Sequence, residues 1–275
     1  MACVGWKTHR GRADRELGSE PPAPLSGSGY EHQGLRRALV DAAQDSAALV
    51  ARREVCRALA TGFEQLGDSL LVHGHLFGPQ RVDGTSPTGN GDDRLVALGY
   101  LSKTAGALIR GALSLTLAGN CYASSALNRQ LVEVEYLAWA FVEDQEEASN
   151  WLRSSNQQRL DRWQPRHLRQ RSQGWFRGAD YSNHCETGGH PTPDGMRQLL
   201  PGNPLVTELV VSEIATHGTS AWDYLRPGVV VLCLELQLEP TTAVPDTHAK
   251  AVGTAEGEWR THERLNLTWQ GRQSS

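Results

Sequence analysis

The sequence predicts an all-α protein, an irregular multi-helix bundle that follows a disordered N-terminal tail. Apolar residues recur at intervals of three and four along most of the chain, which is the spacing of helices with one buried face. Pro and Gly gather in short stretches that separate these periodic segments. Apolar and polar residues alternate in 234–239, but a lone strand in a helical chain would have no partner.

Length and composition fit a soluble globular protein with one large domain, or with a core domain and appendages. The chain has 275 residues, of which 39% are hydrophobic and 21% are charged. Only Lys7, Lys103 and Lys250 are lysines among 27 basic residues, and this arginine bias favours a bacterial protein from a G+C-rich genome. A net charge of −4 gives no overall attraction to nucleic acid.

The cysteines and the apolar segments favour a cytoplasmic protein. The five cysteines are widely spaced and include no CxxC pair, which is typical of reduced thiols. The longest apolar stretch, 95–117, is interrupted by Lys103 and Arg110, so no membrane-spanning helix is expected. Basic residues near Trp6 are not followed by an apolar segment, so no secretory signal is expected.

Residues 1–29 are expected to form the disordered tail, and 30–270 a single helical domain. The tail is rich in Gly, Pro, Ser and charge, and it cannot bury enough apolar area to offset the entropy lost on ordering. Helical spacing begins at Leu35, as one long helix or as two, and Gly74, Gly78 and Pro79 are expected to end it. The region 79–92 contains three glycines and two prolines without periodicity, which predicts a flexible loop.

Two apolar helices are predicted in the middle of the chain. The first covers 94–117 and has Asp92 or Asp93 as its N-cap. A break at 119–120 separates it from the second, which covers 121–142. Small residues in the first helix are expected to permit close approach of a neighbouring helix: Gly99, Gly106 and Gly111.

The next segment combines a predicted helix with the most basic part of the chain. Acidic residues within 144–147 favour the start of a helix that continues through Trp163 and meets Pro165. Its arginines are expected to form a solvated face balanced by nearby acids. The alternative is a patch that faces phosphate groups, with Trp163, Trp175 and Phe176 as stacking surfaces.

The C-terminal part is predicted to contain three helices. Apolar spacing indicates a helix over 205–225 that stops at Pro227. The segment 229–238 fits a strand or a buried helix, and we favour the helix because a strand would have no partner. A final amphipathic helix is expected over 247–265.

Arg129 and Glu133 are candidate ligand-binding residues. They lie four residues apart on the predicted helix 121–142, so their side chains are neighbours on a largely apolar surface. A buried charge needs a partner, and an internal ion pair that fixes the helix register is one interpretation. The other is a polar pocket in which Arg129 binds an anion and Glu133 orients that anion or a histidine.

His190 is a candidate for the histidine of this pocket. It follows Gly188-Gly189, which permit a positive φ and a sharp turn. Pro191 disfavours the helical conformation for His190. We therefore expect His190 to close the loop and point back into the bundle, with a histidine hydrogen-bonded at a helix end as the alternative.

Some of these polar residues match the motifs of a known family. The pair Arg129-x3-Glu133, the Trp-bearing helix and a closing turn from Tyr181 to His190 resemble an uncharacterised family of bacterial all-helical proteins, over about 95–225. That family is distantly similar to HEPN-type helical domains. Some HEPN domains are ribonucleases of phage defence or toxin–antitoxin systems.

The resemblance implies a catalytic alternative. HEPN nucleases carry an arginine and then a histidine with four to six residues between them, and Arg177 with His184, or Arg162 with His167, fits this spacing. Arg177 would bind phosphate and His184 would act as acid or base on a ribose hydroxyl of RNA, commonly at a homodimer interface. About 2.6 such pairs are expected by chance from the composition, so the spacing alone does not favour catalysis.

Neither a metal site nor a cofactor is expected. The residues of ligand type have no spacing typical of a zinc module: His73, His75, His184, Cys185 and His190. Cys185 also stands where the resembling family has Ser. The sequence contains no Gly-rich phosphate loop, nucleophile elbow or HExxH motif.

The favoured function is therefore binding rather than catalysis. Arg129, Glu133, Tyr181 and His190 are predicted to bind a partner or a small anionic ligand in a polar pocket of the bundle. The alternative is a HEPN-like ribonuclease. The sequence leaves open whether the protein is an enzyme, and it does not identify the partner.

Overall fold

The computed structural model describes residues 29–76, 90–199, 203–243 and 246–265. All regular secondary structure in these ranges is helical, so the predicted all-α class is confirmed. The expected tail and the expected flexible loop lie largely outside the described residues, although Gly29 already begins the first helix.

The elements follow one another along the chain with short connections. In order they are α1 (Gly29–Gln44), α2 (Ser46–Leu76), α3 (Asp93–Leu117), α4 (Cys121–Glu143), α5 (Glu146–Arg153), α6 (Asn156–Arg162), α7 (Pro165–Arg171), α8 (Gly178–His184), the π-helix η1 (Cys185–Gly189), α9 (Pro193–Arg197), α10 (Pro204–Glu235), α11 (Pro240–Ala243) and α12 (Asp246–His262).

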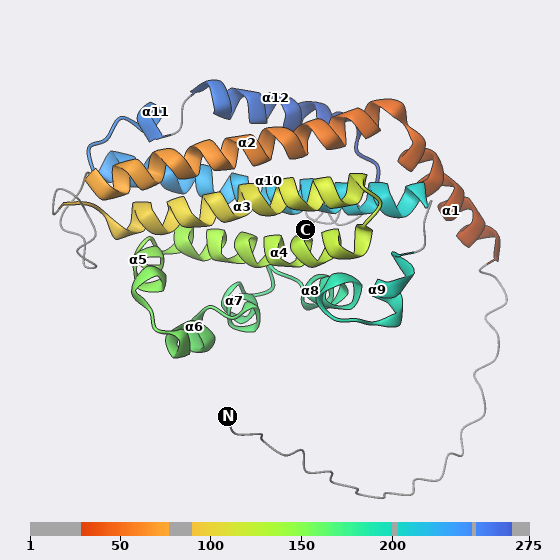
Figure 1. Ribbon diagram of the computed structural model, residues 1–275, viewed down its shortest axis with the longest axis horizontal. Helices are drawn as coiled ribbons and strands as arrows, with labels where there is room; N and C mark the ends of the chain where they lie inside the picture. Colours follow the sequence, from red (N-terminus) through yellow and green to blue (C-terminus); the bar gives the residue numbers. More distant parts are fainter. Residues whose placement is uncertain (1–28, 77–89, 200–202, 244–245, 266–275) are drawn as a thin grey trace, which may run out of the picture.

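Four long helices, α2, α3, α4 and α10, form a bundle (Figure 1). α2 packs on α3, α3 packs on α4, and α4 packs on α10, which also contacts α2 and α3. α3 runs opposite to the other three (Figure 1). The short helices α5 to α9 lie along the outer side of α4, and α12 covers α2 on the opposite side of the molecule.

The ends of α3 and α4 are set by the residues that the sequence indicates. Oδ1 of Asp92 accepts the backbone N–H groups of Arg94 at 2.8 Å and Leu95 at 3.4 Å, so Asp92 is the N-cap of α3. Gly119 has a φ of +84°, which favours glycine, and it turns the chain between the two helices. Asn120 then caps α4.

Glycines let α2 and α3 approach each other closely. A Cβ at Gly106 would lie 2.9 Å from the carbonyl oxygen of Ala60, and one at Gly99 would lie 2.9 Å from Cγ of Leu71. Real side chains do not tolerate these distances, so any larger residue would push the helices apart. The expected role of small residues in α3 is confirmed.

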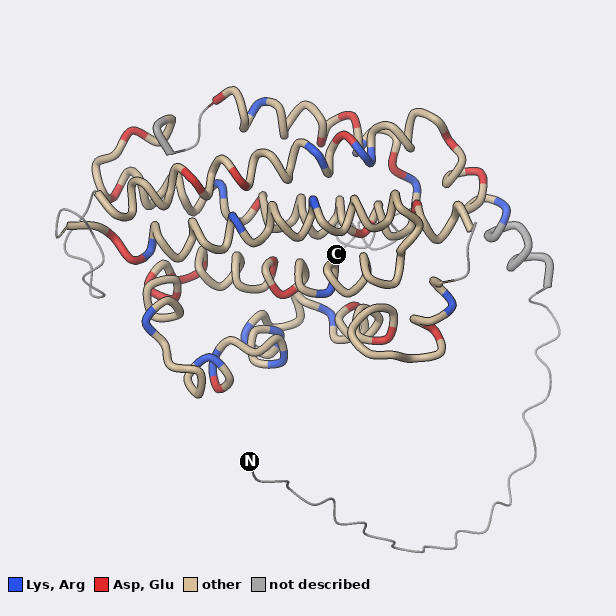
Figure 2. Tube along the Cα trace, in the orientation of Figure 1, with Lys and Arg blue, Asp and Glu red and all other residues tan. Residues whose placement is uncertain are grey.

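Each of the bundle helices buries apolar side chains in the core. Phe63, Ile109, Leu131 and Leu225, one from each long helix, have no exposed surface. Phe63 also meets Trp222 edge to face, with ring centres 5.1 Å apart. Charged residues recur along the bundle helices (Figure 2), and none of the described helices has the length and apolar composition needed to cross a bilayer.

The first periodic segment is two helices rather than one. Asp45 separates α1 from α2, because its Oδ1 accepts the backbone N–H groups of Ala47 at 2.9 Å and Ala48 at 3.0 Å. The sequence predicts that Gly74, Gly78 and Pro79 end this segment, and α2 ends at Leu76, whereas Gly78 and Pro79 lie outside the described residues. Gly74 lies inside the helix, where a Cβ would come within 2.7 Å of Cγ2 of Val96.

The prediction of one helix from 144 to Trp163 is wrong. The chain leaves α5 at Ser154 and begins α6 with a capping box, in which Ser155 and Gln158 exchange side-chain to backbone hydrogen bonds. A serine hydroxyl competes with the helical hydrogen bonds in this way, and local spacing does not reveal it. Pro165 then begins α7 as its first helical residue.

The prediction that Pro227 ends the long C-terminal helix is also wrong. α10 continues to Glu235 and includes most of 229–238, so that segment is helical. Pro227 lies on the exposed side, whereas Leu225 and Val229 have no exposed surface. Burial of the continuing apolar face therefore outweighs the one backbone hydrogen bond that proline removes.

The last helix is shorter than predicted. α12 begins at Asp246 and ends at His262, whereas the sequence suggested an end at Leu265. Oε1 of Glu263 accepts the backbone N–H of Leu265 at 2.5 Å. This side-chain hydrogen bond takes the place of the next helical one and lets the chain leave the helix.

Candidate functional site

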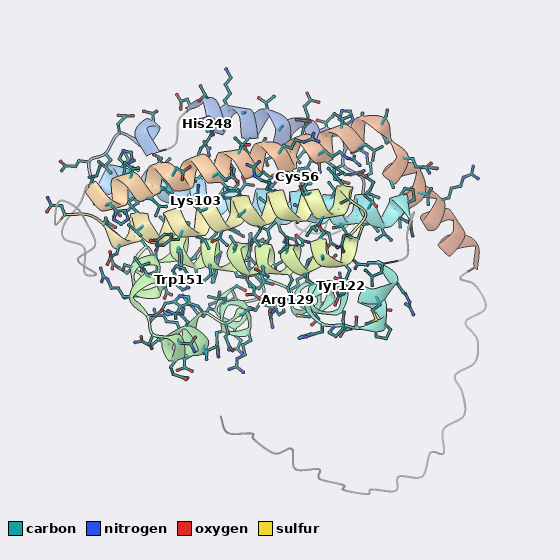
Figure 3. All side chains as sticks on the ribbon, viewed as in Figure 1. Cys56, Lys103, Tyr122, Arg129, Trp151 and His248 are labelled. Carbon is teal, nitrogen blue, oxygen red and sulfur yellow. The ribbon has the colours of Figure 1, made fainter. Side chains whose placement is uncertain are left out.

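Three of the predicted ligand-binding residues meet between α4 and α8. Nη2 of Arg129 lies 2.8 Å from Oε1 of Glu133, one turn further along α4. The same nitrogen donates to the Tyr181 hydroxyl at 2.8 Å, and that hydroxyl donates to Glu133 at 3.0 Å. Figure 3 places Arg129 between α4 and the short helices. We call Arg129, Glu133 and Tyr181 the α4–α8 cluster.

Arg169 of α7 extends the α4–α8 cluster. Its guanidinium carbon lies 4.6 Å from the centre of the Tyr181 ring, and that of Arg129 lies 5.5 Å from the same ring. Burial and the charge of Glu133 raise the pKa of Tyr181 to about 12, so its hydroxyl stays protonated. Nε of Arg129 and Nη1 of Arg169 are buried atoms that make no hydrogen bond of normal geometry with the described residues, although Cys185 interacts with the Arg129 side chain and Tyr136 with that of Arg169.

The π-helix η1 brings the double glycine against α4. A Cβ at Gly188 would lie 2.5 Å from the backbone nitrogen of Ala126, and one at Gly189 would lie 2.8 Å from Cδ of Arg129. Neither glycine has a positive φ, so the predicted sharp turn is wrong. These glycines instead permit η1 to pack directly on α4 and over Arg129.

His190 lies on the surface at the end of η1. Its backbone is extended, with φ −140° and ψ 155°, as the following proline requires. Its backbone N–H donates to the carbonyl of Cys185 at 3.1 Å. The side chain is exposed and takes no part in the hydrogen bonds of the α4–α8 cluster.

Arg177 and His184 occupy the two ends of α8 and differ in exposure. Arg177 is the N-cap residue and is exposed. His184 ends the helix and is 1% exposed, because its ring packs against α10. The described structure therefore does not place these two side chains together on an open groove, which is the arrangement that the ribonuclease alternative requires.

His184 belongs to a buried chain of polar groups that joins α8, α10 and α4. Its Nε2 lies 3.0 Å from Nε2 of His217, and Nδ1 of His217 lies 2.7 Å from Oε2 of Glu135. Burial opposes a charge on His217, but the hydrogen bond and charge of Glu135 outweigh it and raise the pKa of His217. Burial and the neighbouring His217 lower the pKa of His184 to about 3, so His184 is neutral.

Two further carboxylates flank these histidines. Oδ1 of Asp180 lies 3.8 Å from Nε2 of His184, and Oε2 of Glu213 lies 3.6 Å from Nδ1 of the same ring. We call Asp180, His184 and His217 the histidine cluster. Local sequence does not predict this cluster, although the Asp180-x3-His184 spacing places both side chains on one face of a helix. His217 is 33 residues away, and only tertiary packing brings it there.

Three arginines of the basic segment pair with acids, Arg153 with Asp93 and both Arg162 and Arg171 with Glu147. Glu147 is buried and accepts from Arg162, from Arg171 and from the indole N–H of Trp163 at 2.7 Å. Trp163 is itself only 8% exposed, so its ring does not offer a stacking surface. Figure 2 shows Lys and Arg recurring along α5 to α7.

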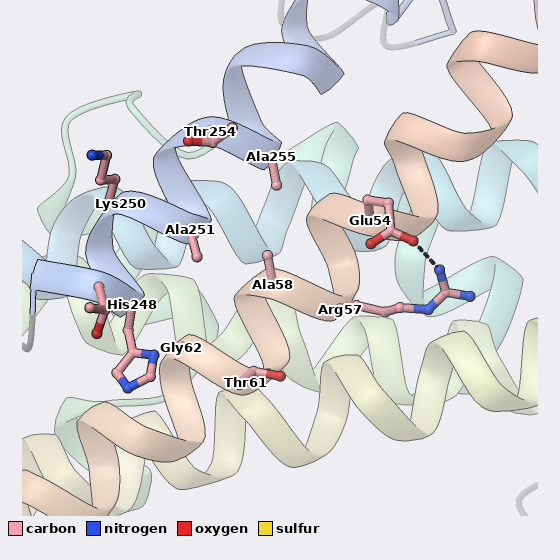
Figure 4. A pocket seen from close by; sticks show the side chains of 11 residues that line it. Glu54, Arg57, Ala58, Thr61, Gly62, His248, Lys250, Ala251, Thr254 and Ala255 are labelled. Atoms are coloured by element: carbon pink, nitrogen blue, oxygen red, sulfur yellow. Dashed lines mark hydrogen bonds and ion pairs between the residues drawn. The ribbon is translucent and has the colours of Figure 1, made fainter.

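A groove of about 630 Å³ lies between α2 and α12, away from all of these clusters (Figure 4). Small side chains, including Ala58 and Ala251, form much of its lining. The Glu54–Arg57 ion pair, at 2.5 Å, lies along its edge. The predicted site residues do not line this groove.

No protein-family model, curated protein or solved structure matches this chain. The resemblance to HEPN-type domains therefore stays a prediction.

Proposed function

We propose that the protein binds a small anionic ligand at the α4–α8 cluster, through Arg129 and Arg169. The observation that carries this proposal is the pair of guanidinium groups on Tyr181, each with a buried N–H that makes no hydrogen bond of normal geometry with the described residues. Buried donors normally find an acceptor, so each such N–H favours an incoming oxygen atom.

The charges of the cluster also favour an anion. Two guanidinium groups face one carboxylate, Glu133, which leaves an excess positive charge. The side chains of Arg129 and Glu133 are 29% and 34% exposed, so a small ligand can reach them while much of the solvent is excluded. Arginine binds carboxylate and phosphate oxygens through paired N–H donors.

The test is calorimetric titration of inorganic phosphate and of citrate into the wild-type protein, Arg129→Gln and Arg169→Gln. Arg166→Gln is the matched control, because Arg166 lies on the same helix as Arg169 and is exposed. We expect binding that weakens at least about tenfold in both site variants and is unchanged in the control. The proposal is wrong if neither anion binds the wild-type protein, or if all variants bind equally.

The predicted ribonuclease stays an alternative, and an RNA cleavage assay tests it. Purified wild-type protein would be incubated with RNA beside Arg177→Ala and His184→Ala. Cleavage that disappears in both variants would support the alternative. The burial of His184 speaks against it, because a general acid or base has to reach the ribose hydroxyl.

A further inference from the structure

We propose that the histidine cluster is a binding site for a divalent transition-metal ion, with Zn²⁺ as the best chemical fit. One nitrogen or oxygen from each of Asp180, His184 and His217 lies within 4.8 Å of the others. Two imidazoles and one carboxylate form the ligand set of an open zinc site, in which water fills the fourth position. The proposal does not depend on anion binding by the α4–α8 cluster.

The spacing of the two imidazoles suits a shared ion. Their Nε2 atoms are 3.0 Å apart. Zinc bound tetrahedrally to two histidines at its usual bond length separates the nitrogens by about 3.3 Å, so the rings need to move apart by only a few tenths of an ångström. Asp180 has a 32% exposed side chain and can rotate toward the same point.

Each imidazole also has a carboxylate on its far side. Glu135 accepts from Nδ1 of His217 at 2.7 Å, and Glu213 lies 3.6 Å from Nδ1 of His184. Metal-binding histidines commonly donate their second N–H to a carboxylate, which fixes the ring and the tautomer. The Nδ1 atom of His184 is buried and has no hydrogen-bonding partner among the described residues, so it is available to donate to Glu213.

The elements around the cluster hold these groups in place and leave one side open. α10 supplies both Glu213 and His217, one helical turn apart, and Asn128 of α4 donates to Glu213 at 3.4 Å. His217 and Glu135 are buried, whereas Glu213 is 44% exposed. A metal ion or a water molecule can therefore reach the cluster from the side of Asp180 and Glu213.

The same geometry has a metal-free interpretation, in which the Nε2–H of His217 donates a hydrogen bond to Nε2 of His184. The two interpretations differ in measurable ways. A hydrogen-bonded pair needs neither Asp180 nor Glu213. A metal site needs Asp180 as a ligand and is weakened when Glu213 loses its charge.

The experiment uses full-length protein prepared without a histidine tag, stripped with EDTA and titrated with Co²⁺ or Zn²⁺. We expect one ion per chain by elemental analysis and, with Co²⁺, the visible absorption of a tetrahedral complex. Asp180→Asn should weaken Co²⁺ binding more than about tenfold, and Glu213→Gln about 10-fold to 100-fold. Both positions are partly exposed, so these variants are expected to fold.

Two controls separate this site from other ligand-type residues nearby. His190→Gln removes an exposed histidine close in the sequence, and Cys185→Ser removes the thiol next to His184. Both should bind Co²⁺ like the wild-type protein. Equal binding by the wild-type protein and Asp180→Asn, or no uptake of either ion at one equivalent, would overturn the proposal.

Discussion

Arg52 and His184 are both buried between helices, yet their surroundings differ. Arg52 is fully buried, and each of its guanidinium nitrogens has a partner: Glu263 at 2.9 Å, Glu208 at 3.3 Å and the carbonyl of Ala42 at 3.1 Å. His184 is almost as buried, but its Nδ1 has no hydrogen-bonding partner among the described residues. The Arg52 cluster is complete, and the histidine cluster is not.

This difference separates a structural role from a binding role. A buried charge with all of its hydrogen bonds satisfied holds helices together and offers nothing to a ligand. A buried group with an unused polar atom needs an explanation, and a ligand is one. The Arg52 cluster joins α1, α2, α10 and the residue after α12, whereas the histidine cluster lies beside the short helix α8.

The largest loss of stability is expected when the Arg52 cluster is broken. Arg52→Gln leaves Glu263 without its cation in a buried place, and we expect the free energy of unfolding to fall by about 3–5 kcal/mol. Urea unfolding followed by circular dichroism measures it. The matched control is Arg57→Gln on the same helix, where both partners of the ion pair are more than half exposed and the loss should stay below about 1 kcal/mol. Equal losses in the two variants would contradict the comparison.

The fold follows from local sequence wherever one side chain decides a helix end. Asp92, one of the two aspartates predicted for that role, caps α3, and Asn120 caps α4 at the predicted break. The predictions at Pro227 and Ser155 are wrong for a physical reason. Whether a proline ends a helix depends on how much apolar surface continues beyond it, and whether a serine starts one depends on its hydrogen bonds.

Local sequence predicts the site residues less completely than it predicts the helices. Arg129 and Glu133 were found because a spacing of four places them together on any helix. His217 was missed because it lies in a helix whose apolar spacing indicates only core. Its partners, Glu135 and His184, are 82 and 33 residues away. Local periodicity contains no information on pairs that meet only through helix packing.

An intermediate loss of stability is expected on substitution of Glu147. Like Arg52, Glu147 is buried and fully hydrogen-bonded, but its partners Arg162 and Arg171 are partly exposed. Burial raises the pKa of Glu147, but hydrogen bonds from Arg162, Arg171 and Trp163 outweigh it and lower the pKa below its ordinary value of 4.5. Such a carboxylate stabilises the fold above pH 4.5, and the contribution is lost as the pH falls through the lowered pKa.

We therefore expect Glu147→Gln to lower the free energy of unfolding by about 1–3 kcal/mol near neutral pH. The difference from the wild-type protein should shrink as the pH is lowered below 4.5. Unfolding curves at several pH values measure this. The adjacent Glu146→Gln is the control, because that side chain is 64% exposed and a change within about 0.5 kcal/mol is expected. A loss at Glu147 that is independent of pH would contradict the assignment.

The smallest expected effect lies in the α4–α8 cluster and distinguishes its hydroxyl from its ring. Tyr181→Phe removes two hydrogen bonds but leaves the Arg129–Glu133 ion pair, so a loss of about 0.5–1.5 kcal/mol is expected. Tyr181→Leu also removes the surface on which Arg129 and Arg169 stack, and it should cost more. Urea unfolding compares the two. An equal loss in both variants would mean that the ring does not hold the guanidinium groups, and the geometry proposed for anion binding would lose its support.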